Sequence, residues 1–172
     1  MKLSHFPVLI PAFTAQIEID TPLAITPSLL NIPFIPYSGS IISAPDYPYQ
    51  IHARFIHGAD YLRLDADDRH VRLDVRATAQ DTDTGGLLLL NYNGIVDITG
   101  DEGLIIRGDD NAHTTGFGNA FVQVRFETVD SCLQPIENKL YVGSGRFIVA
   151  EGQPIIVEYK ISEVVAAYED WD

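Results

Sequence analysis

Cysteine, basic residues and long apolar runs are all scarce in this sequence of 172 residues. Cys132 is the only cysteine, which excludes an internal disulfide and a thiolate metal cluster. Acidic residues number 24 against 11 basic ones, and the formal charge of -13 would repel a phosphate backbone. We therefore expect no nucleic-acid partner.

No apolar run reaches the roughly 18 residues that a membrane-spanning helix needs. The segment 1–15 carries one lysine and an apolar patch, but Pro7 and Pro11 interrupt it and no small-residue cleavage site follows. We therefore expect a cytoplasmic protein with no membrane partner.

Motifs for metals, nucleotides and nucleophilic catalysis are also missing. The glycines of 85–86 and 143–145 do not open helices, so they lack the N–H cradle of a phosphate loop. No Ser-His-acid order is present, and the histidines form no HxH or HExxH pair. We therefore expect no metal and no cofactor. The scattered histidines are His5, His52, His57, His70 and His113.

Alternation of apolar and polar residues is what the sequence has in abundance, and it predicts an all-β chain. The apolar fraction of 46% suits one soluble domain, 1–172. Six prolines make 22–48 a loop-rich region with short extended pieces at 32–43. Helical periodicity is weak, at 136–141 and in the acidic tail 166–172. The expected extended segments are 13–19, 50–55, 61–65, 71–79, 87–94, 95–99, 104–107, 121–128, 140–142, 146–150 and 155–164, with a turn at 57–60.

About eight to ten strands would leave reactive edges in an open sheet, and closure into a barrel removes those edges. We therefore predict a single antiparallel β-barrel with little helix; a β-sandwich is the alternative. The hairpin 71–94 is the most informative part of it. Its first strand has a polar face of Arg72, Asp74, Arg76 and Thr78, which lies either in water or in a ligand-filled cavity, and barrel closure favours the cavity.

Several separated segments resemble one family of small bacterial and fungal proteins known as a domain of unknown function, whose members look like lipocalin-type β-barrels. The resemblance covers roughly 34–164. The matching residues are Ser38-Gly39, Gly58-Ala59-Asp60-Tyr61, Leu73-Asp74-Val75-Arg76, Thr82-Asp83-Thr84-Gly85, Tyr92-Asn93-Gly94, Phe126-Glu127-Thr128, Asn138 and Tyr141-Val142-Gly143-Ser144-Gly145.

The resemblance implies a function through the fungal relatives, which look like cofactor-free isomerases or cyclases of natural-product intermediates such as meroterpenoids. This chain departs from the family pattern at three places. It has Gly58-Ala59-Asp60-Tyr61 for Gly-Gly-Asp-Trp, Asp83-Thr84 for two acids, and Ile136-Glu137-Asn138 for Trp-Leu-Asn. These places are expected to lie in the pocket, so the departures count against a ligand shared with bacterial relatives.

Three residues are the predicted catalytic groups. Asp60 and Glu127 are acids whose pKa would rise in an apolar barrel, which makes them usable proton donors or acceptors. Arg76 would offer guanidinium donors to a carbonyl or enolate oxygen. The alternatives are a turn role for Asp60, and an interior ion pair or a solvated face for Arg76 and Glu127.

Five further residues are predicted to bind substrate: Tyr61, Asp83, Tyr92, Arg125 and Asn138. The tyrosines combine apolar surface with a hydroxyl that can stabilise a developing oxyanion, or they simply pack in the core. Arg125 and Glu127 share a strand face, where they would either face inward and orient a substrate or form an exterior ion pair. Asn138 would polarise a carbonyl or tie backbone.

The leading hypothesis is a cofactor-independent isomerase or cyclase that uses acid–base chemistry on a hydrophobic, oxygenated metabolite inside the barrel. Two alternatives remain open. One is a non-catalytic carrier of small hydrophobic ligands, and the other is a structural module whose barrel is filled by its own side chains. A homodimer is a further expectation, through the region 22–48 and the aromatic tail 168–172.

Overall fold

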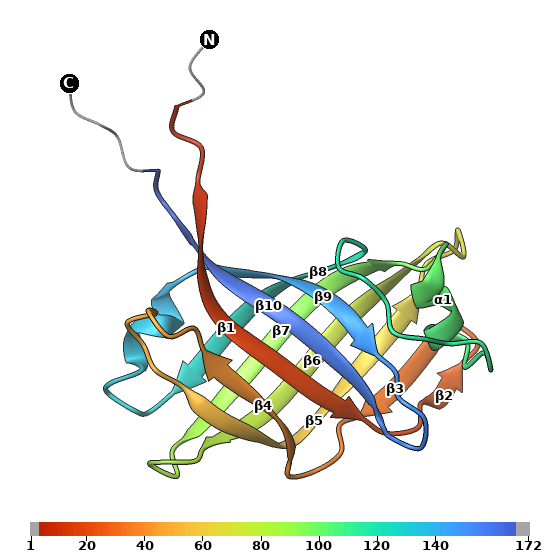
Figure 1. Ribbon diagram of the computed structural model, residues 1–172, viewed down its shortest axis with the longest axis horizontal. Helices are drawn as coiled ribbons and strands as arrows, with labels where there is room; N and C mark the ends of the chain where they lie inside the picture. The colour runs from red at the N-terminus through yellow and green to blue at the C-terminus, as the bar shows by residue number, and fades with distance from the viewer. Residues whose placement is uncertain (1–3, 168–172) are drawn as a thin grey trace.

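Period-two alternation folds most of this chain into antiparallel strands (Figure 1). The computed structural model describes residues 4–167. Within them no helix is long and apolar enough to cross a membrane. The elements of this part of the chain are β1 Val8–Ile19, β2 Leu23–Thr26, β3 Leu29–Pro33, β4 Ser38–Ser43, β5 His52–Leu64, β6 His70–Asp81, β7 Leu87–Asp97, α1 Asp101–Ile106, β8 Ala120–Thr128, the 3-10 helix η1 Gln134–Asn138, β9 Tyr141–Ile148 and β10 Ile155–Val165.

The strands close into a barrel because β5, which pairs with β4, also pairs with β6 at the far end of the sheet order. Going round the ring, the order is β5, β4, β1, β10, β9, β8, β7 and β6, and β6 pairs back onto β5. The short strands β2 and β3 continue the sheet beside the second half of β5. All pairings are antiparallel, so the prediction of a closed antiparallel β-barrel with little helix is confirmed.

Packing differs between the two halves of the barrel. One half is filled by aromatic rings whose centroids lie 5.1 to 5.4 Å apart around Phe13: Tyr47, Phe126 and Tyr141. Such offset and edge-to-face contacts fill the lumen and close that end. The other half contains an open cavity. The alternative of a barrel filled by its own side chains therefore applies to one half only.

The polar face of β6 points away from the lumen. Val71, Val75 and Ala77 are buried inside, whereas Arg72 and Arg76 alternate with them and are exposed. The expectation that this face lines the cavity is wrong. An apolar lumen accepts the apolar face of the strand, while an inward guanidinium would lose its hydration without an ion partner.

A β-bulge decides which residues of β5 face inward. The pairing of β5 with β6 shifts between Phe55 and His57, so that the buried positions pass from Phe55 to Gly58 and then to Asp60. The predicted turn at 57–60 is therefore wrong, because β5 runs unbroken from His52 to Leu64. Gly58 serves close packing instead, since a Cβ there would lie 2.7 Å from the ring of Phe34.

Other segments also differ from the prediction: 87–94 and 95–99 join in β7, and 140–142 and 146–150 join in β9. Residues 104–107 are not a strand: Asp101–Ile106 form α1, where Ile105 is buried and the buried Glu102 accepts hydrogen bonds from Asn119 at 3.1 and 3.2 Å. The region 22–48 holds the three short strands β2, β3 and β4. Residues 168–172 of the predicted acidic tail lie outside the described residues, and 166–167 have no regular structure.

Candidate functional site

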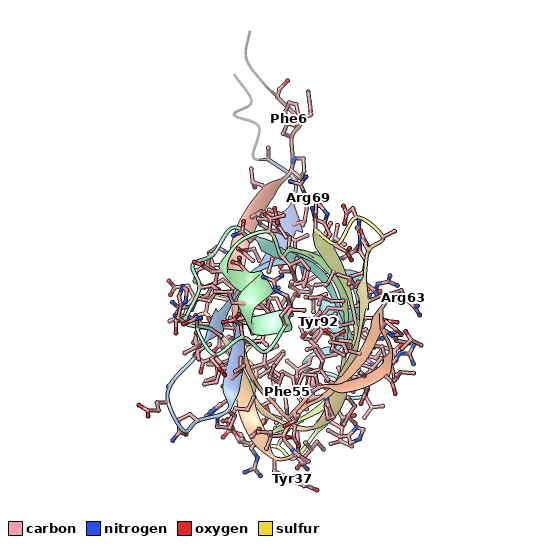
Figure 2. All side chains as sticks on the ribbon, turned by 90° about the vertical axis from the view of Figure 1, so that its right-hand side faces the viewer. Phe6, Tyr37, Phe55, Arg63, Arg69 and Tyr92 are labelled. Atoms are coloured by element: carbon pink, nitrogen blue, oxygen red, sulfur yellow. The ribbon has the colours of Figure 1, made fainter. Side chains whose placement is uncertain are left out.

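A cavity of about 590 Å³ opens at the end of the barrel that carries α1, β2 and β3. Figure 2 views the molecule from this end, with Tyr92 inside the ring of strands and Tyr37 and Arg63 outside it. Most of the wall is apolar, and its main contributors are Ile17, Leu30, Ile32, Phe34, Leu62, Leu73, Phe147 and Val157. The charged lining residues within 4–167 are Asp20, Asp60 and Arg107. The cavity therefore suits a small, mainly apolar molecule.

Asp60 is the buried carboxyl of this cavity. The backbone N–H of Asp74 donates to Asp60 Oδ1 at 2.9 Å, where the ladder between β5 and β6 is interrupted. Within residues 4–167 no hydrogen bond reaches Oδ2, which leaves that oxygen for a ligand. Burial raises the pKa of Asp60 to about 7, against the opposing hydrogen bond from Asp74. Asp60 can therefore exchange a proton near neutral pH.

Two tyrosines from opposite parts of the chain meet beside this carboxyl. Tyr92 comes from β7 and Tyr159 from β10, and their ring centroids lie 5.2 Å apart in an edge-to-face contact. The two hydroxyl groups are hydrogen-bonded to each other. Burial, with the nearby Asp60, raises the pKa of both phenols, so both keep their protons at neutral pH. Since one hydroxyl donates within the pair, the other remains a donor for an oxygen atom in the cavity.

The position of Tyr159 depends on a glycine in the neighbouring strand. Gly145 of β9 lies opposite Tyr159, and a Cβ at position 145 would lie 2.6 and 2.8 Å from the tyrosine ring. No real side chain tolerates such contacts, so the missing side chain at Gly145 makes room for the ring.

Arg107 lies at the mouth of the cavity, directly after α1. It also lines a smaller adjoining cavity of about 360 Å³. The two cavities share Leu30, Leu62 and Ile106 as well as Arg107, so Arg107 lies where they meet.

Of the eight predicted site residues, the structure brings Asp60 and Tyr92 together in the cavity and leaves the others elsewhere. Tyr61 is exposed on the outer face of β5, because the bulge turns Asp60 inward and its neighbour outward. Asp83 lies exposed in the turn between β6 and β7, and Asn138 lies exposed at the end of η1.

Three predicted residues on β6 and β8 also lie outside. Arg76, Arg125 and Glu127 are exposed on the outer surface, because Val75, Val124 and Phe126 occupy the inward positions of their strands. The expected inward arrangement of Arg125 and Glu127 is therefore wrong, and these three side chains do not reach the lumen.

Sequence reasoning missed two residues of the site. Tyr159 stands in the apolar period of β10 between Val157 and Ile161, a pattern that marks it as inward-facing. Arg107 was hidden by the assignment of 104–107 to a strand, and a one-turn helix leaves little periodicity to detect.

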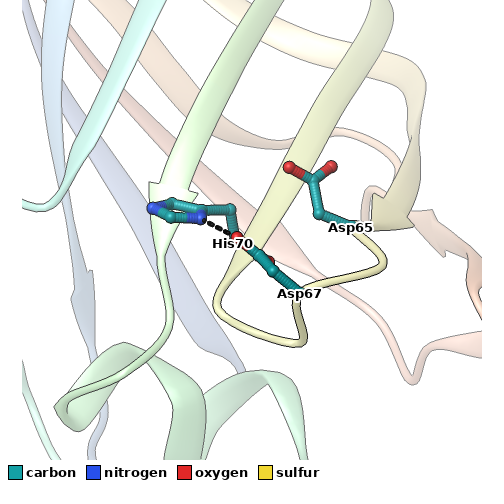
Figure 3. Close-up of side chains that lie close together, drawn as sticks. All are labelled: Asp65, Asp67 and His70. Carbon is teal, nitrogen blue, oxygen red and sulfur yellow. Dashed lines mark hydrogen bonds and ion pairs between the residues drawn. The ribbon is translucent and has the colours of Figure 1, made fainter.

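Figure 3 shows a second group of polar side chains, in the turn between β5 and β6. Ligand atoms of Asp65, Asp67 and His70 lie within 4.8 Å of one another. However, Arg72 binds Asp65 with contacts of 2.9 to 3.2 Å, and His70 Nδ1 lies 2.9 Å from Asp67. These pairs already engage both carboxylates, so the group stabilises the turn.

A buried polar network closes the opposite end of the barrel. The Tyr47 hydroxyl donates to Glu163 Oε2 at 2.6 Å and lies 2.7 Å from the Tyr141 hydroxyl, while Lys139 Nζ donates to Glu163 Oε1 at 2.6 Å. Burial raises the pKa of Tyr141 to about 12, and Lys139 and Tyr47 lower the pKa of Glu163 against the effect of burial. The network fixes the loop that carries Tyr47 across this end.

Comparisons with known proteins agree with this architecture. A family model described as protein of unknown function (DUF3237) matches residues 7–164. A conserved protein of unknown function from Rhodopseudomonas palustris superposes with a TM-score of 0.73 at 18% identity, covering 96% of this chain and 100% of that chain. A beta-barrel like protein from Acinetobacter baumannii superposes with a TM-score of 0.65 at 18% identity, covering 92% of this chain and 96% of that chain. A protein with unknown function from Clostridium acetobutylicum superposes with a TM-score of 0.69 at 15% identity, covering 93% of this chain and 100% of that chain. A comparison with curated proteins gave no match. At these identities the solved structures show a shared fold.

Proposed function

The chain belongs to the family described as protein of unknown function (DUF3237), and from its cavity we propose an acid–base isomerase or cyclase that acts on apolar, oxygen-bearing metabolites without a cofactor. The meroterpenoid-like intermediates implied by the family resemblance are one such class of metabolite.

One observation carries the proposal: a buried carboxyl and a pair of buried tyrosines converge from three strands in an otherwise apolar cavity. Asp60, Tyr92 and Tyr159 come from β5, β7 and β10 and share the cavity wall. Simple packing would be served equally well by Phe and Leu at these positions, and burial of a lone carboxyl costs stability. Such a cost is typical of functional sites.

The reaction follows from the roles that these groups can take. Asp60 as carboxylate removes a proton from the carbon next to a substrate carbonyl; the C–H bond breaks and its electrons form an enolate. The hydroxyl of Tyr159, oriented by Tyr92, donates to the enolate oxygen. Where the substrate carries a β,γ double bond, the enolate is a dienolate, and Asp60 returns the proton to its γ carbon, which gives the conjugated isomer. A cyclisation instead uses the enolate carbon as a nucleophile on a second electrophilic carbon, whose oxygen takes the proton. Either sequence restores the enzyme and balances without an added electron carrier.

A carrier of small hydrophobic ligands is the second candidate function. It is favoured by the position of Arg76 and Glu127, since two of the three expected acid–base groups lie outside the lumen. In a carrier, Asp60 and Tyr159 would only orient the ligand.

Proton exchange separates the two functions. Wild-type protein is incubated in D₂O with 2-decalone, a bicyclic apolar ketone, and exchange of its α-protons is followed by ¹H NMR. We expect catalysed exchange that falls about 10²-fold or more in Asp60→Asn and about 10²-fold in Tyr159→Phe. In wild type, kcat/KM should rise with pH through about 7, as Asp60 ionises.

Arg76→Ala and Glu127→Gln are the matched controls on the outer surface, and both should exchange at the wild-type rate. Exchange by wild type no faster than buffer, with the ketone shown to bind, would leave the carrier function.

A further inference from the structure

Positive charge at the cavity is confined to one side chain within the described residues. Arg107 is the basic residue among the lining residues of both cavities. Within residues 4–167 its guanidinium has no ion pair or hydrogen-bond partner, although acidic residues outnumber basic ones 24 to 11 in the chain. In so acidic a protein, an unpaired guanidinium at a cavity mouth is available to an anion from outside.

The short helix holds this guanidinium close to the cavity. The backbone N–H of Arg107 donates to the Gly103 carbonyl at 3.0 Å. A Cβ at position 103 would lie 2.7 and 2.8 Å from the two terminal nitrogens of Arg107, so the guanidinium folds back over the bare glycine. The buried Ile105 and the bonds from Asn119 to Glu102 fix this helix to the barrel.

Polar groups therefore occur at two levels of the cavity, with an apolar wall between them. Asp60 and the tyrosine pair are buried, Arg107 is at the mouth, and Ile17, Leu62 and Phe147 contribute to the wall. The carboxyl of Asp20 is also at the mouth, where it accepts the backbone N–H of Thr21 at 2.7 Å. An anion would thus be attracted to the α1 side of the opening.

We propose that the ligand is an amphipathic carboxylic acid whose carboxylate pairs with Arg107 while its apolar body fills the cavity toward Asp60. The placement of the reacting end of the ligand at Asp60 rests on the proposed function. The placement of its carboxylate rests on Arg107 alone. A guanidinium binds a carboxylate with two parallel hydrogen bonds, which fixes the orientation of the molecule as well as adding affinity. The end that carries the carbonyl then lies next to Asp60.

The test compares two probes of equal chain length, dodecanoate and dodecan-1-ol, as competitors of the neutral fluorescent dye N-phenyl-1-naphthylamine at pH 8. Wild type should bind the acid about tenfold more tightly than the alcohol, because only the acid forms the charged pair. Arg107→Gln should lose this preference and keep its affinity for the alcohol, and Arg107→Lys should keep part of the preference. Arg63→Gln, on the outer face of β5, should behave as wild type.

Equal affinities of wild type for acid and alcohol, an unchanged preference in Arg107→Gln, or binding of neither probe would each overturn the inference. Asp60→Asn separates the inference from the proposed function. A variant that retains the acid preference but exchanges ketone protons as fast as wild type would refute the role of Asp60 and leave Arg107 as the carboxylate site.

Discussion

Because of Asp60, the free energy of unfolding of this protein should contain a contribution that falls as pH rises, which is the reverse of the usual contribution of a carboxyl group. The informative change is Asp60→Asn, which removes the ionisable group and keeps nearly the same shape. The asparagine oxygen can still accept the hydrogen bond that the Asp74 N–H donates at 2.9 Å. The variant therefore isolates the cost of placing a negative charge in the cavity wall.

The magnitude follows from the pKa of Asp60, which burial raises from its ordinary value of 3.8 to about 7. The unfolded chain loses this proton more readily than the folded one, so rising pH favours unfolding between about pH 4 and pH 7. At about 1.4 kcal/mol for each tenfold difference in proton affinity, the free energy of unfolding falls by about 4 kcal/mol. Below pH 4 this loss is absent, and above pH 7 it is complete.

The assay is urea unfolding followed by far-ultraviolet circular dichroism, from pH 4 to pH 8 at constant ionic strength. From pH 4 to pH 8 the free energy of unfolding of Asp60→Asn should rise by about 4 kcal/mol relative to that of wild type. For a chain of this size, that corresponds to about 10 °C in Tm. Other titrating groups, such as Glu163, contribute equally to both proteins and cancel in the difference.

Glu127→Gln provides the matched control, because it replaces an exposed carboxyl on the outer face of β8. Its unfolding free energy should run parallel to that of wild type across the whole pH range. Parallel curves for Asp60→Asn and wild type would refute the reasoning, since they would mean that the charged form of Asp60 costs nothing in its folded surroundings.

Three other changes test the packing at Gly145, the buried polar network around Glu163 and the outward position of Arg76. Gly145→Ala should destabilise the barrel by about 1–3 kcal/mol in urea unfolding, because its Cβ would lie 2.6 Å from the ring of Tyr159. A fold as stable as wild type would show that the ring is free to move. Tyr47→Phe should cost about 1–3 kcal/mol at pH 7 by the same measurement, since it removes the donor at 2.6 Å from Glu163 Oε2 and leaves only Lys139 on Oε1. Because the folded pKa of Glu163 is lowered, that cost should shrink as acid protonates the carboxyl; a constant cost would contradict the hydrogen bond. Arg76→Ala should leave the affinity for N-phenyl-1-naphthylamine unchanged, and a weakened affinity would place this side chain in the lumen after all.

Local sequence pattern predicted most of the strands correctly, because alternation is a property of neighbouring residues. The hairpin of β6 and β7 and the strand β10 follow it closely. Closure was also predictable, since many short strands need partners for their edges. By contrast, α1 has six residues, too few for a helical period, and β5 crosses a glycine that local rules read as a turn.

The sequence by itself determined an acidic all-β barrel and pointed to Asp60 and Tyr92 as residues to examine. It could not determine whether the polar face of a strand such as β6 lines a ligand-filled cavity or lies in water, because alternation marks the two faces without showing what the lumen contains. Tertiary structure decided this, placing the apolar faces in the lumen and leaving Arg76 and Glu127 outside. It also placed the bulge after Phe55 that turns Asp60 inward. Tyr159 lies 99 positions after Asp60 in the sequence (159 − 60), and the tertiary structure places both residues in the same cavity. Contacts of this kind arise from strand order around a closed barrel, which no local stretch of residues encodes.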